Sequence, residues 1–265
     1  MSLTDDLNLI LGLKLENDPF SGLSPLPNVR LAWTPKPDLL VWAAVSRAIR
    51  APTPFDTDVV EKQGQTVFLT GNPDFEPEKL TAFEAGDRAE FGTASVSFSA
   101  FYNLYTDLRS IEFSPGPALP LLWGNGMTGH IYGLESWGSY QAATWWRLDA
   151  GLTLQHEHQG FAPGSSRLLG VAQAGDDPHT QARLRSSMDF GKFSFDADFR
   201  YVGMLPGPAV PAYIELDSRL AWRIAAATEI AVSGMNLLHA HHQEWTIPPA
   251  DEIPRMVFLE LRQSF

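Results

Sequence analysis

Apolar and polar residues alternate one by one along much of this chain. In the segment 193–202, one set of alternate positions holds Phe193, Phe195, Ala197, Phe199 and Tyr201. The other set holds Ser194, Asp196, Asp198 and Arg200. Successive side chains of a β-strand point to opposite faces, so a period of two predicts strands with one apolar and one charged face. About twelve such strands are predicted, over residues 7–16, 26–33, 38–50, 80–91, 94–112, 127–138, 143–157, 180–190, 192–204, 211–223, 227–238 and 255–265.

The connections between these segments are of two lengths. Short turns are expected near Pro35–Pro37, Gly92–Thr93, Ser139–Ala142, Gly191 and Ala225–Ala226. They alternate with longer loops over residues 17–25, 51–79, 113–126, 158–179, 205–210 and 239–254. Outer-membrane barrels combine short periplasmic turns with long extracellular loops in this way. The pattern therefore predicts an all-β, antiparallel, up-and-down segment of a transmembrane β-barrel.

Aromatic residues gather beside the short turns and at the C-terminus. Amphipathic rings settle at the level of the lipid headgroups, so these positions suit an interfacial girdle. A soluble β-sandwich would show the same alternation without the two loop lengths, and it is the alternative that solubility without detergent would support. The girdle residues are Trp33, Phe91, Trp145, Trp146, Phe190, Phe193, Trp222 and Phe265.

Composition narrows the function classes. The net charge of −12 argues against a nucleic-acid partner, whose phosphates need a basic surface. The chain has no cysteine, which excludes disulfides, thiol catalysis and cysteine-ligated zinc. No run of about 18 apolar residues predicts a transmembrane helix. The N-terminus lacks the basic and apolar stretches of a signal peptide, so a fragment or a mature form is expected.

An ordered series of motifs resembles the barrel of TonB-dependent outer-membrane receptors. The series begins with a tryptophan-containing strand and an "SRA-R-P" element, continues with "NP" and "PE", and ends with "E-G-R". Later matches are FYNLYTDL from Phe101, YGLE from Tyr132 and GMNLL from Gly234, and Phe265 resembles the aromatic-ended assembly signal of such barrels. The motif positions are Ser46, Arg47, Ala48, Arg50, Pro52, Asn72, Pro73, Pro77, Glu78, Glu84, Gly86 and Arg88.

This resemblance implies more than the periodicity does. Residues 1–265 would be the C-terminal half of a barrel of about 22 strands, without the N-terminal plug domain. The implied function is TonB-dependent uptake of a scarce nutrient across the bacterial outer membrane, with a ferric siderophore as the expected nutrient and cobalamin or another chelate as alternatives. The implied partners are outer-membrane lipid, the plug and earlier strands, the TonB energy-coupling complex and an iron chelate. The alternative is a self-contained 12-stranded outer-membrane pore without energy coupling.

The candidate chemistry is that of binding, because no catalytic constellation and no resident cofactor are predicted. Charged residues of the polar faces either form a ligand-binding wall or pair across strands as a charge ladder, which is the favoured reading. Aromatic residues near the longer loops either contact a ligand or anchor the barrel at the interface. The candidate ligand-binding residues are Tyr105, Trp123, Phe161, Arg183, Arg185 and Arg200.

Histidines near two of the longer loops have a spacing that could bind a transition metal. We expect them to be exposed polar loop residues, and no metal site is predicted. The region 53–71 contains no histidine, which counts against haem. The residues are His156, His158 and His179 near one loop and His239, His241 and His242 in the other.

Overall fold

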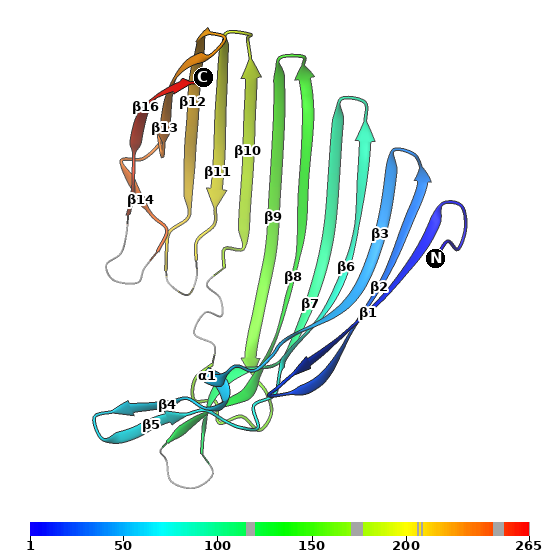
Figure 1. Cartoon of the computed structure of the whole chain (residues 1–265), viewed down its shortest axis with the longest axis vertical. Helices are drawn as coiled ribbons and strands as arrows, with labels where there is room; N and C mark the ends of the chain where they lie inside the picture. Colours follow the sequence, from blue (N-terminus) through cyan, green and yellow to red (C-terminus); the bar gives the residue numbers. More distant parts are fainter. Residues whose placement is uncertain (115–119, 171–176, 206, 208, 246–251, 265) are drawn as a thin grey trace. The chain divides into compact units, whose positions relative to one another are not determined.

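Antiparallel β-strands make up most of the computed structural model, which describes residues 1–114, 120–170, 177–205, 207, 209–245 and 252–264 (Figure 1). All twelve predicted strands are present, and each hydrogen-bonds to the next, so the predicted up-and-down fold is confirmed. They are β1 (Leu7–Asp18), β2 (Gly22–Lys36), β3 (Leu39–Arg50), β6 (Glu78–Phe91), β7 (Ala94–Phe113), β8 (Leu121–Ala143), β9 (Trp146–Phe161), β10 (Thr180–Asp189), β11 (Phe193–Val202), β12 (Tyr213–Ala225), β13 (Thr228–Met235) and β16 (Met256–Gln263). Phe265, the predicted assembly signal, lies outside the described residues.

The chain divides into two compact units, and four strands, β6 to β9, contribute residues to both. The first unit comprises Met1–Gly86, Ala100–Gly133 and His156–Ala174, with the strand order β1-β2-β3-β6-β7-β8-β9. The second unit comprises Asp87–Ser99, Leu134–Gln155 and Gly175–Phe265, with the strand order β6-β7-β8-β9-β10-β11-β12-β13-β16.

The register keeps the apolar faces of neighbouring strands together within each unit. In the first unit, Leu9 of β1 lies opposite Leu31 of β2. In the second unit, Phe195 of β11 lies opposite Leu220 of β12. These faces are open rather than packed, since Leu31 is 41% exposed and Leu220 53% exposed. A soluble sandwich would bury such faces, whereas a lipid-facing sheet leaves them uncovered by protein.

Most of the predicted short turns are confirmed. Gly92 and Gly191 have positive φ angles of 61° and 80°, which glycine adopts without steric cost. The turn placed at 139–142 is wrong, because β8 continues to Ala143 and β9 begins at Trp146.

The predicted loop over 17–25 is also wrong, since β1 and β2 are joined by the three residues 19–21. The Oδ1 atom of Asp18 accepts hydrogen bonds from the backbone N–H groups of Phe20 and Ser21, and Gly22 takes a φ of 70°. The predicted loop ended at Pro25, but Pro25 lies within β2, as does Pro27, which was predicted to lie in a strand. Short turns and long loops therefore do not alternate strictly.

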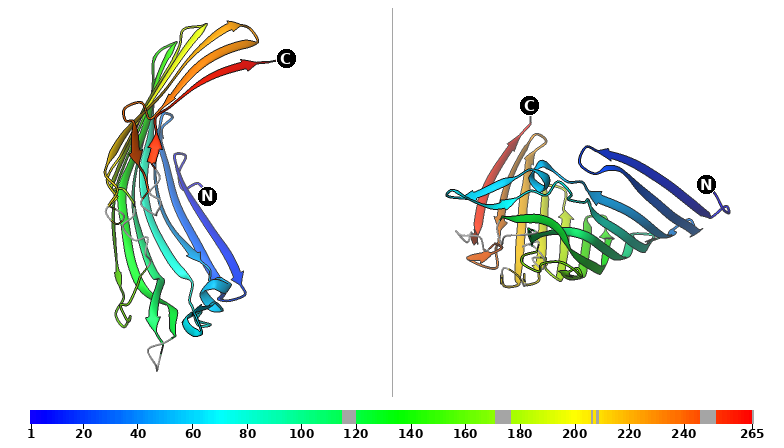
Figure 2. Two further views of the ribbon diagram at one scale, coloured as in Figure 1. Left: turned by 90° about the vertical axis from the view of Figure 1, so that its left-hand side faces the viewer. Right: turned by 90° about the horizontal axis from the view of Figure 1, so that it is seen from below.

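Two of the predicted long loops contain ordered elements that the sequence pattern missed. The segment 51–77 folds into the single turn α1 (Pro54–Thr57) and the hairpin β4 (Val60–Gln63) and β5 (Thr66–Thr70). Figures 1 and 2 show α1 beside this hairpin, and β5 pairs in parallel with the start of β8. The last loop contains the short pair β14 (His241–Gln243) and β15 (Glu252–Pro254). None of the described helices is long and apolar enough to cross a membrane.

Candidate functional site

Charged side chains cover the polar face of β10 to β13 in the second unit. The register places like charges directly opposite each other at two points, Arg183 with Arg200 and Asp198 with Asp217. Such pairs repel, and the face is neutralised diagonally instead. The Nε atom of Arg183 donates to Asp198 at 2.8 Å, and Arg185 lies 3.7 Å from Asp196. The predicted cross-strand charge ladder is therefore present.

Arg200 of β11 contacts two carboxylates and one aromatic ring. Its Nε atom donates to Glu215 of β12 at 2.8 Å, and its Nη2 atom lies 2.6 Å from Glu244 in the segment after β14. Its guanidinium carbon also lies 5.4 Å from the centre of the Tyr213 ring, within range of a cation–π contact. One guanidinium thus joins two neighbouring strands to the last long connection of the chain.

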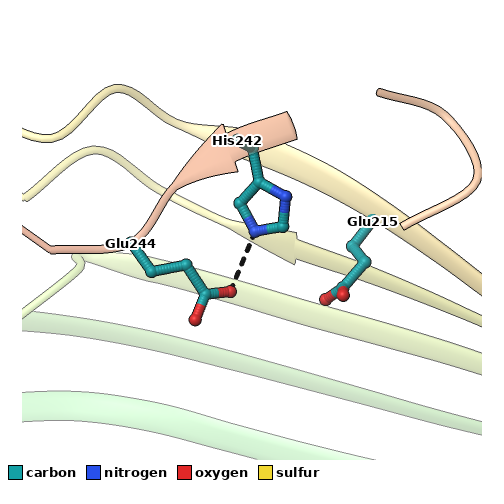
Figure 3. Close-up of side chains that lie close together, drawn as sticks. All are labelled: Glu215, His242 and Glu244. Atoms are coloured by element: carbon teal, nitrogen blue, oxygen red, sulfur yellow. Dashed lines mark hydrogen bonds and ion pairs between the residues drawn. The ribbon is translucent and has the colours of Figure 1, made fainter. Parts of the chain in front are cut away.

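His242 of β14 closes this cluster. Its ring stacks on Tyr213 with the ring centroids 4.4 Å apart, and its Nε2 atom lies 3.0 Å from Glu244 (Figure 3). Only 8% of His242 is exposed, so the expectation of an exposed loop histidine is wrong for this residue. Its Nδ1 atom has no hydrogen-bond partner among the described residues. Beside it lies a hollow of about 430 Å³ that Tyr201 and His239 also line.

Three side chains of this cluster have the donor atoms of a metal site. A ring nitrogen of His242 and carboxylate oxygens of Glu215 and Glu244 lie within 4.8 Å of one another. Imidazole and carboxylate are common zinc ligands. Arg200, however, is ion-paired with both carboxylates and supplies the positive charge there. The pKa of Glu244 lies below its usual value, because hydrogen bonds from His242 and Tyr213 and the charge of Arg200 outweigh the opposing effect of burial. The geometry is that of an ion-pair cluster in which both carboxylates are paired and only the Nδ1 atom of His242 lacks a partner among the described residues.

A second charged cluster lies in the first unit around Asp56 of α1, which is fully buried. Arg50 donates from Nη1 to Asp56 at 2.9 Å and from Nε to Glu78 at 2.6 Å. Arg109 of β7 lies 3.3 Å from Asp56 and donates its backbone N–H to Glu78 at 2.8 Å. Asp56 also accepts the N–H and hydroxyl of Thr53, which caps α1. Burial opposes the charged carboxylate, but these hydrogen bonds outweigh it and lower the pKa of Asp56.

Aromatic rings cover the same cluster. The guanidinium of Arg109 lies 4.7 Å from the Trp123 ring centre, and Phe55 lies 5.6 Å from Trp123. Gly71 lies very close to the backbone at the end of α1. A Cβ atom at position 71 would lie 2.3 Å from the carbonyl carbon of Thr57. The motif residues Arg50 and Glu78 are ion-paired in this cluster, and the backbone N–H of Asn72 donates to the carbonyl oxygen of Asp56 at 2.9 Å. The motif residue Pro52, just after β3, is buried.

The predicted site residues fall into different surroundings. Arg183, Arg185 and Arg200 belong to the ladder, and Trp123 belongs to the Asp56 cluster and lies in β8 rather than in a loop. Tyr105 of β7 and Phe161 of β9 are half-buried. Of the other motif residues, Arg47 is exposed and Glu84 is half-buried. Pro73 directly follows Asn72 in the chain. The guanidinium of Arg88 lies over the Trp137 ring. The ligand-binding role of all these residues stays a prediction.

Sequence reasoning missed Asp56, Arg109, Tyr213 and Glu244. The only sequence signal for Asp56 was its position three residues after Thr53, the spacing of a capping residue and the N3 position. Nothing local marked the other three, because their roles depend on contacts between distant segments. His156 and His158, expected beside a loop, lie within β9.

The profile of a protein family described as "TonB dependent receptor-like, beta-barrel" matches residues 1–237. No curated protein matches the chain. Among solved structures, the siderophore receptor PirA from Acinetobacter baumannii is similar, with 15% identity and a TM-score of 0.76, over 99% of this chain and 44% of that one.

Two further structures show the same fold at similarly low identity. The ferric enterobactin receptor PfeA from Pseudomonas aeruginosa, determined with enterobactin, has 15% identity and a TM-score of 0.76, over 100% of this chain and 44% of its own. The copper transporter OprC has 16% identity and a TM-score of 0.72, over 99% of this chain and 47% of its own. The chain thus spans less than half the length of these structures.

Proposed function

Because the chain belongs to the TonB dependent receptor-like β-barrel family, we propose that it is the C-terminal barrel portion of an outer-membrane receptor that imports a ferric siderophore. The match over residues 1–237 is the observation that carries this proposal. The family is one of receptors and transporters rather than enzymes. In the proposed receptor, the partners of this barrel portion are outer-membrane lipid, a plug domain and the TonB energy-coupling complex.

Each face of the strands has a distinct role in this proposal. The open apolar faces contact the hydrocarbon core of the membrane, where polar backbone groups must be paired and strands satisfy them through their neighbours. The charged faces line the wet interior of the receptor. The charge ladder of β10 to β13 then holds the wall rigid, because four of its arginines are tied to carboxylates of adjacent strands. They are Arg183, Arg185, Arg200 and Arg219.

The Arg200 cluster and the Asp56 cluster act as anchors for the long connections in this proposal. Arg200 ties Glu244 and the β14 segment to the strands, and Arg50 and Arg109 tie α1 to the ends of β3 and β7. Ligands of such receptors arrive at the long-loop side, so anchored loops present a preformed surface. Tyr105, Trp123 and Phe161 are the aromatic residues that we propose to contact the chelate from this side.

Uptake measurements in cells test the proposal. A strain that lacks the gene for this chain should lose accumulation of radiolabelled iron from at least one member of a panel of ferric catecholate and hydroxamate chelates. Complementation should restore accumulation, and a strain lacking TonB should show the same loss with the gene intact. Iron accumulation that is unaffected by the deletion across the panel would contradict a siderophore receptor. Accumulation that needs this gene but not TonB would favour the self-contained pore.

A further inference from the structure

A shallow apolar groove crosses the open face of the first unit. It spans β2, β3, β6 and β7 and has a volume of about 410 Å³. Its lining combines the small side chains Ala43, Ala85 and Ala100 with larger ones. The larger lining residues include Val29, Leu31, Val45, Phe83 and Tyr102, each between 41% and 44% exposed. The shape and chemistry of this groove suit a hydrocarbon chain, because nearly all of its surface is apolar.

A row of aromatic and imidazole rings begins where the groove ends on β7. Tyr102 stacks on His130 of β8 at 5.7 Å between ring centroids, and His130 lies 5.3 Å from the ring of His158 on β9. Tyr132 stacks on both Tyr102 and His130, at 6.1 Å each. Tyr102 therefore belongs both to the groove and to the ring row.

The imidazoles of this row have polar capacity that the protein does not use. The imidazole rings of His130 and His158 form no hydrogen bond with any described residue, and His158 is exposed. Every neutral imidazole carries one N–H donor and one acceptor, and the protonated ring carries two donors. Two such rings side by side offer donors to an oxyanion at the edge of an otherwise apolar face.

The position of the row along the strands fits the boundary of a membrane. A tilted transmembrane β-strand needs about 9–11 residues. Counted from Ala94, the first residue of β7, the ninth residue is Tyr102, and counted from Trp146, the first residue of β9, the thirteenth is His158. Tyr102 thus lies at the end of a span of this length, and His158 lies just beyond it, where lipid headgroups begin.

We infer that this face binds one phosphate-bearing membrane lipid, with an acyl chain in the groove and its phosphate at His130 and His158. Tyr102 forms the junction, with its ring against the chain and its hydroxyl at headgroup level, as tyrosine commonly does at membrane interfaces. The groove alone would accept any apolar chain, and the imidazole pair supplies the preference for phosphate. This inference rests on the membrane location proposed above and is independent of the ligand that the receptor imports.

Lipid retention by the full chain, refolded in detergent and measured by native mass spectrometry, tests the inference. The probes are phosphatidic acid and a diacylglycerol with the same acyl chains, which differ only in the phosphate. Phosphatidic acid should be retained with an affinity about tenfold higher, the effect of one hydrogen bond to a charged group. Equal retention of the two lipids would overturn the role of the imidazoles.

Two variants separate the headgroup from the groove. The double variant His130→Ala/His158→Ala should lower phosphatidic acid retention to the level of diacylglycerol, and the control His241→Ala, on the separate strand β14, should not. Ala100→Phe should fill the groove and reduce retention of both lipids, whereas Ala197→Phe on the apolar face of β11 should reduce neither. Unchanged retention in the double variant or in Ala100→Phe would overturn the inference.

Folding and function are read separately. Far-ultraviolet circular dichroism establishes that each variant retains its strand content. The variant His130→Gln keeps an N–H donor at this position. It should therefore retain part of the preference for phosphatidic acid if His130 donates to the lipid. Iron accumulation in cells is a separate readout. A wild-type chain that shows no preference for phosphatidic acid but supports uptake would overturn the lipid site alone, whereas specific lipid retention without uptake would overturn only the siderophore proposal.

Discussion

Arg183 of β10 and Arg200 of β11 lie directly opposite each other, and each forms its ion pairs away from the other. Arg183 pairs diagonally with Asp198, while Arg200 pairs with Glu215 on the next strand and with Glu244 in the last long connection. Opposed like charges destabilise a sheet, so each arginine depends on its carboxylates. The arrangement makes Arg200 a link between sheet and loop whose removal has predictable consequences.

Replacing Arg200 with methionine should destabilise the second unit. Methionine keeps most of the apolar stem but leaves Glu215, which is 7% exposed, without its counter-charge. We expect a loss of about 1–2 kcal/mol, because the half-exposed guanidinium makes the effect smaller than that of breaking a fully buried pair. Thermal unfolding of the refolded chain in detergent measures the loss. The matched control Arg147→Met breaks the exposed pair with Asp149 and should lower the unfolding temperature by less, because water screens an exposed ion pair. Equal effects would show that Arg200 is only a surface charge.

Asp56→Asn should release α1 from the strands of the first unit. The fully buried carboxylate is shared by Arg50 and Arg109, and an amide can neutralise neither. Removing one partner of a buried ion pair typically costs about 3–5 kcal/mol, and the half-exposed arginines place this variant at the lower end, near about 3 kcal/mol. Hydrogen exchange of residues 53–75 should rise strongly. Asp74→Asn, at an exposed position in the same connection, should leave exchange unchanged.

The same carboxylate predicts a response to acid. The pKa of Asp56 in the folded chain lies below its ordinary value of 3.8, so the charged form stabilises the fold. This stabilisation is complete above pH 3.8 and is lost as the pH falls through the folded-state pKa. Protease sensitivity of the segment 53–75 should therefore stay constant from neutral pH down to this range and then increase. The Asp56→Asn variant should be sensitive at every pH, and wild-type sensitivity that began to increase near pH 6 would implicate a different group.

Gly71→Ala should disturb the connection between β5 and β6. The new methyl group would lie 2.3 Å from the carbonyl carbon of Thr57 and 2.4 Å from the backbone nitrogen of Asp58, so the backbone must shift. We expect a cost of about 1–3 kcal/mol, as for overpacking elsewhere. Gly160→Ala is the control, because a methyl group at Gly160 would meet no atom within 4 Å. If the unfolding curves of the two variants coincide, the backbone around position 71 shifts without a measurable cost in stability.

The sequence predicted the strands well, but it predicted neither the Asp56 cluster nor the Arg200 cluster. Period-two patterns such as that of Phe193 to Tyr201 directly encode strand faces, and the charge ladder follows from the same alternation. The predicted loop over 17–25 was wrong because β2 begins at Gly22 and accommodates Pro25 inside the strand. The Arg50–Asp56–Arg109 and Arg200–Glu244–His242 clusters join segments up to 53 residues apart, and local patterns carry no information about such contacts. His242 was expected to be exposed because its burial depends on stacking against Tyr213 of another strand.

Arg200 also decides whether the carboxylates beside His242 can accept a metal ion. In the wild-type chain its guanidinium is ion-paired with both Glu215 and Glu244, so a divalent cation would have to displace it. Arg200→Ala frees the two carboxylates, which lie with a ring nitrogen of His242 within 4.8 Å of one another, a donor set that suits Zn²⁺. We expect this variant to bind Zn²⁺ at least about tenfold more tightly than the wild type in calorimetric titrations, since removing one unit of positive charge at this distance is worth more than about 1.4 kcal/mol. The double variant Arg200→Ala/His242→Ala should lose the gain. Tight binding by the wild type, or equal affinity in all three proteins, would show that Arg200 does not control these carboxylates.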